Sequence, residues 1–195
     1  MAAPERLMRE LRPHVADPRV LAVIAEVPRE LFVPPELRED AWENIPLPIG
    51  AGQTISQPLV VARMCELLEL RGDETVLDVG TGSGYHAALL ARLAAQVHSI
   101  EVHESLSRTA AANLRAAGVE NVTLSVGDGS RGLPEHSPYE AINVAAAADD
   151  VPSALAAQLA PGGRLVAPVA ERLVVLRDGR RESHEHVAFV PLIAD

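Results

Sequence analysis

An apolar run followed by three closely spaced glycines constrains this chain more than any other feature. The segment reads Thr75-Val-Leu-Asp-Val-Gly-Thr-Gly-Ser-Gly-Tyr85, with Asp78 near the end of the run and Gly80, Gly82 and Gly84 after it. Glycines at such positions let the backbone turn sharply and approach a ligand closely before a helix begins. The segment therefore predicts a strand, a tight loop and a helix whose N-terminus presents free N–H groups.

The acidic residue distinguishes this loop from a dinucleotide-binding loop. That fingerprint is Gly-x-Gly-x-x-Gly, and here Tyr85 stands in place of its third glycine. The carboxylate of Asp78 would repel a pyrophosphate and attract an ammonium group. Asp-x-Gly-x-Gly-x-Gly resembles the first motif of class I methyltransferases, which bind S-adenosylmethionine, and the resemblance implies that Thr81 and Ser83 lie in the donor loop. A plain glycine-rich turn is the alternative interpretation.

Two further acidic residues follow later strand-like runs. Glu101 ends one run, where a carboxylate can accept hydrogen bonds from both ribose hydroxyls. Asp128, in Val126-Gly-Asp-Gly-Ser130, could accept from an adenine amino group, and we expect the adjoining Val102 and Gly129 in the same site. The structural alternatives are a solvated strand-end charge for Glu101 and an ordinary turn residue for Asp128.

From about residue 58 onward, strand-like runs alternate with helical stretches, which predicts a parallel sheet with crossover helices. The predicted strands are residues 75–79, 97–101, 122–126, 139–144 and 164–168. The predicted helices are residues 58–70, 84–95 and 104–117, and one that begins near Pro152. Two more strands, 172–177 and 186–192, are expected around the hairpin signal Asp178-Gly179.

The first 57 residues have a different texture, rich in Pro and charge. Residues 18–26 predict a short helix that stops before Pro28. The prolines and glycines that follow, up to Pro58, forbid long regular structure. A stretch of this length is either disordered or functional. Its apolar residues favour packing against a domain: Phe32, Trp42, Ile45, Leu47 and Ile49.

Charge and cysteine content exclude several classes of function. In 195 residues, 17 Lys and Arg against 27 Asp and Glu give a net charge of −10, which disfavours nucleic acid and anionic lipid as partners. Cys65 is the single cysteine, so no intrachain disulfide forms, and His184 with His186 lacks a third metal ligand. With no apolar run of membrane-spanning length, we expect a cytoplasmic monomer without a metal site or membrane partner.

Three motifs in the Pro-rich segment resemble protein-L-isoaspartate O-methyltransferases. They are Val27-Pro-Arg-Glu-Leu-Phe-Val-Pro-Pro35, Pro46-Leu-Pro-Ile-Gly50 and Gly52-Gln-Thr-Ile-Ser-Gln-Pro58. The third discriminates, because other class I methyltransferases lack it. The core is similar to the same family at residues 77–85, 126–130, 160–164 and 189–193, and the likeness covers roughly residues 18–195.

The resemblance implies a fold and an activity. The fold is a doubly wound, mostly parallel α/β sheet of seven strands, with a C-terminal antiparallel hairpin and an N-terminal helical, Pro-rich lid. Residues 1–57 would form the helical and substrate-loop segment, packed on a core of residues 58–195. The family methylates the free carboxylate of isoaspartyl residues in damaged proteins or peptides, with S-adenosylmethionine as the methyl donor. The ester then collapses to a succinimide, which hydrolyses partly to normal Asp.

By the same resemblance, Gln53, Thr54, Ile55 and Ser56 lie over the methyl donor and hold the substrate. The Ser56 hydroxyl would hydrogen-bond the reacting carboxylate and is not a nucleophile. No general base is needed, because a carboxylate with a pKa of about 4 is ionised at pH 7. The residues alone leave another interpretation open, in which Thr54 or Ser56 caps the helix that begins near Pro58.

Some positions depart from the family pattern. Leu59 stands where His or Tyr is common, Ala145 replaces a hydroxyl residue, and Asn143 stands where an apolar strand residue is expected. Asp149 adds charge at the mouth of the site. Leu59, Ala145 and Asp149 motivate a second hypothesis, a carboxyl methyltransferase with one dedicated peptide substrate, such as an aspartate side chain in a biosynthetic peptide. A third hypothesis is a non-catalytic S-adenosylmethionine-binding module, against which the loop at residues 53–58 argues.

Overall fold

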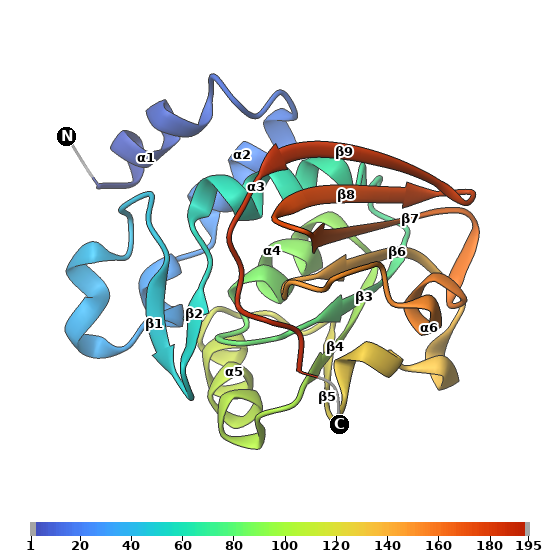
Figure 1. Cartoon of the computed structure of the whole chain (residues 1–195). Coiled ribbons are helices and arrows are strands. Elements are labelled where there is room, and N and C mark those ends of the chain that lie inside the picture. The colour runs from blue at the N-terminus through green and yellow to red at the C-terminus, as the bar shows by residue number, and fades with distance from the viewer. Residues whose placement is uncertain (1–2, 194–195) are drawn as a thin grey trace.

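The computed structural model describes residues 3–193 and contains a seven-stranded sheet (Figure 1). Its strand order is β5-β4-β3-β6-β7-β8-β9, parallel from β5 to β7 and antiparallel from β7 to β9. The predicted fold class is confirmed. The strands are β3 (Thr75–Val79), β4 (Gln96–Glu101), β5 (Val122–Val126), β6 (Tyr139–Val144), β7 (Leu159–Val169), β8 (Arg172–Arg177) and β9 (Arg180–His186).

Helices cover the sheet, and most follow the predicted ranges within a few residues. They are α1 (Ala3–Leu11), α2 (Pro18–Glu26), α3 (Pro58–Leu67), α4 (Tyr85–Leu93), α5 (Glu104–Ala116) and the single-turn α6 (Ser153–Ala156). The pattern analysis did not predict α1. Within residues 3–193, no helix is both long and apolar enough to cross a bilayer.

The strand order places a crevice at the carboxyl end of β3. The chain adds β4 and then β5 on one side of β3, and afterwards adds β6 on the other side. In open α/β sheets, ligands bind outside the strand ends at such a switch point. The register also aligns polar residues there, since Asp78 pairs with Ser99 of β4 and with Asn143 of β6.

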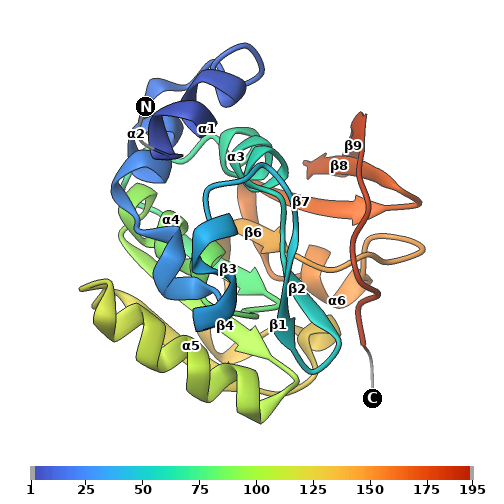
Figure 2. The same cartoon turned by 90° about the vertical axis from the view of Figure 1, so that its left-hand side faces the viewer.

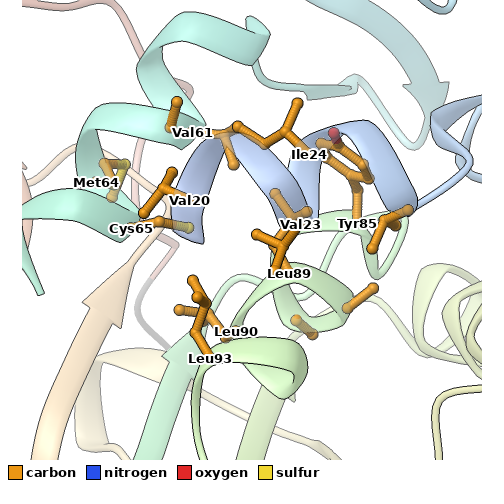
Figure 3. Close-up of a cluster of buried hydrophobic side chains, with 14 of the residues drawn as sticks. Val20, Val23, Ile24, Val61, Met64, Cys65, Tyr85, Leu89, Leu90 and Leu93 are labelled. Atoms are coloured by element: carbon orange, nitrogen blue, oxygen red, sulfur yellow. The ribbon is translucent and has the colours of Figure 1, made fainter. Parts of the chain in front are cut away.

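The N-terminal helices and the sheet helices share one buried cluster (Figure 3). Ile24 of α2 is fully buried and lies near Tyr85 of α4. Further side chains of the cluster come from α2, α3 and α4: Val20, Val23, Val61, Met64, Cys65, Leu89, Leu90 and Leu93. Burial of these apolar side chains is what docks the first residues of the chain onto the sheet.

The Pro-rich segment contains two short 3-10 turns, Arg29–Phe32 and Pro35–Asp40, and a hairpin of β1 (Leu47–Gly50) and β2 (Gln53–Ile55). The hairpin lies beside the carboxyl ends of β3 and β4 (Figures 1 and 2). Phe32, Trp42 and Leu47 are buried as predicted. The expectation for Ile45 is wrong, because the chain turns there and leaves its side chain 47% exposed.

The second tail strand differs from the prediction, being Arg180–His186 rather than 186–192. Asp178 and Gly179 have φ of 49° and 74°, and they form a two-residue turn that pairs Arg177 directly with Arg180. Such a turn makes the strand resume at once, whatever the polarity of the residues. At the edge of the sheet these charged side chains stay in water. The apolar residues 187–192 instead cross the strand ends (Figure 1).

Truncation of Ile24 tests whether α2 belongs to the shared core. Ile24→Ala should lower the free energy of unfolding by about 2–5 kcal/mol, because it leaves a cavity in a fully buried cluster. The measurement is urea unfolding of the full chain, with Ile45→Ala as the exposed control, expected to change it by less than about 0.5 kcal/mol. Equal effects of the two substitutions would contradict the shared core.

Candidate functional site

The loop after β3 turns through three glycines and brings α4 against the strand end. Gly80, Gly82 and Gly84 have φ of 92°, 54° and 88°, where residues with a Cβ are rare. A Cβ at Gly84 would lie 3.3 Å from the Cβ of Ala110, and one at Gly82 would lie 3.2 Å from Cδ1 of Ile49. The close approach of α5 and of the β1–β2 hairpin therefore also favours glycine here.

Asp78 lies behind this loop as a fully buried carboxylate. Its Oδ2 accepts a hydrogen bond from the Ser99 hydroxyl (2.8 Å), and its Oδ1 accepts one from the Asn143 amide (2.7 Å). The Thr81 hydroxyl lies 2.6 Å from that of Ser99 and extends the network into the loop. Burial raises the pKa of Asp78 to about 6, against the two hydrogen bonds, which lower it. The contact of Asp78 with a ligand ammonium group stays a prediction.

The structure gives a reason for the polar residue at Asn143. The Nδ2 that bonds Asp78 also lies 3.2 Å from Nδ1 of His86. Because this amide donates, Nδ1 accepts and the imidazole proton resides on Nε2. Burial lowers the pKa of His86 to about 3, so the ring is neutral at pH 7. This network was not predicted from the sequence, although three polar residues near the ends of neighbouring strands were a signal for it.

Glu101 joins the ends of β3 and β4. Its Oε2 accepts the N–H of Gly82 (2.8 Å) and its Oε1 accepts the N–H of His103 (3.0 Å). The residue is 5% exposed and lines a cavity beside the glycine loop. An ionised carboxylate has about four acceptor sites, so two remain for a ligand. Glu101 is therefore more than a solvated strand-end charge.

Asp128 caps a one-turn 3-10 helix, Gly129–Arg131. It accepts the N–H and the hydroxyl of Ser130 (2.9 and 2.7 Å) and pairs with Arg131 at 3.2 Å. A Cβ at Gly129 would lie 2.6 Å from Cγ1 of Val79, so glycine is required where this turn meets β3. The turn interpretation of Asp128 is confirmed, and its contact with adenine stays a prediction.

A narrow cavity of about 60 Å³, here called the loop cavity, lies among the glycine loop, the β1–β2 hairpin and residues 190–193. The predicted site residues that line it are Gln53, Thr54, Gly80, Gly82, Glu101, Val102 and Gly129. Those that do not are Ile55, Ser56, Asp78, Thr81, Ser83, Gly84 and Asp128. Residues 190–192 were predicted as the end of a strand, and none of residues 190–193 as part of a site.

Two further cavities adjoin the loop cavity. The inner cavity, of about 40 Å³, is lined by four other predicted residues: Ile55, Ser56, Thr81 and Ser83. The acceptor-side groove, of about 610 Å³, is open and runs from Thr54 and Ser56 to residues 186–190. Thr54 and Ala145 line all three cavities, and Val190 lines the loop cavity and the groove, so these two cavities meet at Thr54, Ala145 and Val190.

A buried arginine holds the segment that carries Ser56. The fully buried guanidinium of Arg29 donates to the carbonyls of Ala41, Ile45 (3.3 Å) and Ser56 (3.1 Å). Its Cζ lies 5.7 Å from the ring centre of Tyr85, within reach of a cation–π interaction. Burial lowers the pKa of Arg29 to about 10, so the charge remains at pH 7. No sequence signal distinguished Arg29 from the exposed arginines.

Helix α3 is not capped by Thr54 or Ser56, which makes the capping alternative wrong. Its N-cap residue is Gln57, without a side-chain cap. The N–H of Leu59 is accepted instead by the side-chain oxygen of Asn44 (3.0 Å), which reaches over from the Pro-rich segment. Ser56 therefore does not cap the helix, and it lines the groove and the inner cavity.

Metal ligands do not gather in the described part of the chain. Within residues 3–193, no group of three or more His, Cys, Asp or Glu side chains could hold a metal ion. His184 and His186 lie on the edge strand β9, where His186 Nε2 is 3.0 Å from Nη1 of Arg172. This pair of histidines therefore belongs to the edge of the sheet.

Comparison with known proteins adds a family to this geometry. The family model described as protein-L-isoaspartate(D-aspartate) O-methyltransferase matches residues 2–195. Protein-L-isoaspartate O-methyltransferase 1 of Anaeromyxobacter sp. (strain Fw109-5) is 59% identical over 166 residues, which cover 84% of this chain and 78% of the relative. The corresponding protein of Methanoregula boonei is 53% identical over 187 residues, which cover 92% and 86%.

Solved structures agree in fold. A protein-L-isoaspartate O-methyltransferase superimposes with a TM-score of 0.85 at 28% identity, over 96% of this chain and 65% of that one. A Plasmodium falciparum structure with the same family description, in complex with S-adenosyl-L-homocysteine, superimposes with a TM-score of 0.86 at 22% identity, over 97% and 98%. At that identity the second comparison shows the fold alone.

The raised pKa of Asp78 predicts how stability depends on pH. An unfolded Asp titrates near 3.9, so between about pH 4 and pH 6 the folded state binds the extra proton. The contribution of protonated Asp78 to the free energy of unfolding is fully present below about pH 4. It is lost as the pH rises through about 6. Asp78→Asn keeps the acceptor oxygen without the titration. We compare the free energies of unfolding of the wild type and of this variant. The wild-type value minus the variant value should fall by about 3 kcal/mol from pH 4 to pH 7.

The measurement is urea unfolding of both proteins across that pH range. Asp150→Asn is the control of opposite sign, because the hydrogen bond from Arg181 lowers the pKa of this exposed Asp. The free energy of unfolding of the wild type minus that of Asp150→Asn should grow as the pH rises through the acid range. A wild-type-minus-Asp78→Asn difference that stays constant with pH would show that Asp78 does not titrate with a raised pKa.

Proposed function

The chain belongs to the protein-L-isoaspartate(D-aspartate) O-methyltransferase family, and from this membership we propose which of its residues carry out the reaction. The protein is an S-adenosylmethionine-dependent enzyme that methylates isoaspartyl carboxylates for protein repair. The observation that carries our assignment of roles is the meeting of the loop cavity and the groove at Thr54 and Ala145. The methyl group would cross between donor and acceptor at these two residues.

The loop cavity offers the groups that the methyl donor needs. Glu101 has two acceptor sites free for the ribose hydroxyls, and Gly80 and Gly82 of the glycine loop line the cavity beside it. Val102 and the neighbouring Val79 and Ile100 supply apolar surface for a purine ring. We assign Asp128 and Gly129 to the adenine end. Asp78, through the Thr81–Ser99 network, would act from behind the loop.

Donor binding requires the walls of the loop cavity to separate. Cavities that enclose small molecules usually measure roughly 300–1,000 Å³, and the loop cavity measures about 60 Å³. The β1–β2 hairpin is a short strand pair, and its Ile49 side chain lies against Gly82 of the glycine loop. We propose that this hairpin shifts outward when the donor binds and closes over it afterwards.

The acceptor side needs positioning more than acid–base chemistry. When bound, S-adenosylmethionine supplies an electrophilic methyl group on a sulfonium. A carboxylate oxygen forms the new C–O bond as the C–S bond breaks, and it is already ionised at pH 7. Orientation of the two reactants can supply roughly 7–11 kcal/mol of the barrier. We assign that task to the Ser56 hydroxyl, Gln53 and the backbone of Thr54 and Ile55.

We propose further that the protein works as a cytoplasmic monomer on isoaspartyl peptides and proteins, without nucleic acid. A net charge of −10 supports the last point, because nucleic acid requires a basic face. In this proposal residues 1–57 form the substrate-loop segment and residues 58–195 the donor-binding core. Their common hydrophobic cluster supports one functional unit.

The function is tested with methyl-labelled S-adenosylmethionine and paired peptides that carry Asp or isoaspartate at one position. We expect base-labile label on the isoaspartyl peptide only. Ser56→Ala should lower kcat/KM by about 10- to 100-fold, the worth of one hydrogen bond to a charged group, and should leave S-adenosylhomocysteine binding intact. Glu101→Gln is the matched variant on the donor side and should weaken that binding.

Three outcomes would contradict the assignment. Equal labelling of Asp and isoaspartyl peptides would show that the acceptor is not selected as proposed. A normal rate for Ser56→Ala would remove this hydroxyl from the acceptor site, and donor binding without label on any carboxylate would favour the non-catalytic hypothesis.

A further inference from the structure

The acceptor-side groove is larger than one carboxyl group requires. Its volume of about 610 Å³ lies in the range of sites that hold whole small molecules. One wall carries Thr54, Ser56 and Val60, from the substrate loop and α3. The other wall is the segment after β9, which descends past the hairpin (Figures 1 and 2). Residues that flank the reacting isoaspartate therefore have a place to bind.

Glu171 brings a carboxylate to this groove from the turn between β7 and β8. Its backbone is held against the opposite wall, because its carbonyl accepts the N–H of Val187 (2.9 Å). The side chain is exposed, and within residues 3–193 no ion pair of Glu171 occurs. A carboxylate without a cation of its own is available to a positive group on a bound chain.

The cationic residue next in sequence does not neutralise it. Arg172 directs Nη1 to Nε2 of His186 (3.0 Å) and Nη2 to the carbonyl of His184. Its guanidinium is thus committed to β9. Arg172 donates to Nε2 of His186, which lines the groove.

A second carboxylate lies at the same corner. The carbonyl of Ala148 accepts the N–H of Ala170 (3.3 Å), which brings residues 148–149 beside the turn that holds Glu171. Asp149 is exposed, and within the described residues it makes no ion pair. Asp149 does not line the groove, but its carboxylate adds to the negative potential around the turn that holds Glu171.

We propose that the groove binds the residues flanking the isoaspartate and that Glu171 selects acceptors with a Lys or Arg close to it. This inference rests on the proposed function of the site. Phe189 and Val60 give the groove apolar surface for the neighbouring side chains, and Glu171 provides the charge discrimination. Selectivity arises from attraction of a basic flank together with repulsion of an acidic one. The protein would thus be a repair enzyme with a charge preference.

The test uses a set of isoaspartyl peptides. Each peptide carries Lys, Gln or Glu at one of the two positions before or the two positions after the isoaspartate, and the peptides are otherwise identical. For the wild type, kcat/KM should be about three- to tenfold higher for the best Lys peptide than for its Glu counterpart, as expected of one exposed charge pair plus its repulsive opposite. The difference should lie in KM. Raising the salt concentration from about 0.01 M to about 1 M should abolish it, because the Debye length shrinks from about 30 to about 3 Å.

Variants locate the preference on one side chain. Glu171→Gln should bring the Lys-to-Glu ratio close to one, and Glu171→Lys should invert it. Residue 171 has φ of 64°, which Gln and Lys adopt as Glu does, so neither change strains the turn further. Glu120→Lys is the control, since it makes the same change in net charge beside β5 at the opposite edge of the sheet.

The outcomes separate this inference from the function on which it rests. If no isoaspartyl peptide accepts label, the proposed function itself fails. If all peptides accept label at equal kcat/KM, or if Glu171→Gln keeps the wild-type ratio, the function stands and the role of Glu171 is refuted. If Glu120→Lys alters the ratio as strongly as Glu171→Lys, overall charge and not the groove sets the preference.

Discussion

The acceptor half of the site depends on one buried guanidinium. Arg29 donates to the carbonyls of Ala41, Ile45 and Ser56, three points along a segment with little regular structure. A buried carbonyl without a hydrogen-bond partner costs about 1–3 kcal/mol. In a strand the neighbouring strand supplies these partners, and in this irregular segment the Arg29 side chain supplies them. Its charge persists, and the Tyr85 ring lies under it. The segment can therefore present Ser56 to the groove from a fixed backbone.

The donor half is held by a different device. Polar residues on three adjacent strands meet in register, and the buried carboxylate of Asp78 accepts hydrogen bonds from Ser99 and Asn143 on either side. Glu101 then ties the glycine loop to the end of the next strand. This half is built on the seven-stranded sheet, with which the β1–β2 hairpin does not pair. The two halves meet at Thr54 and Ala145, so a rigid donor platform faces an acceptor loop that Arg29 holds.

The sequence predicted what local patterns determine. Apolar period and glycine spacing predicted six of the seven sheet strands and the tight loop after β3, and the motif at residues 52–58 indicated the family. It could not reveal Arg29 or Asn143, because their roles come from carbonyls and strands distant in the chain. The predicted strand at 186–192 is wrong, although its composition is apolar. The turn at residues 178–179 pairs Arg177 with Arg180 and therefore determines where β9 begins. The groove and Glu171 likewise arise only when distant segments meet.

Hydrogen exchange of Arg29→Lys in the full chain tests the central claim most directly. Lysine keeps the charge but lacks the planar fork that reaches three carbonyls. The account predicts that amides of residues 41–57 exchange at least about tenfold faster, the effect of losing about 1.4 kcal/mol of local stability, while residues 75–84 keep their protection. Unchanged exchange at residues 41–57, or an equal loss of protection in both segments, would contradict the claim that Arg29 holds the acceptor half independently of the donor half.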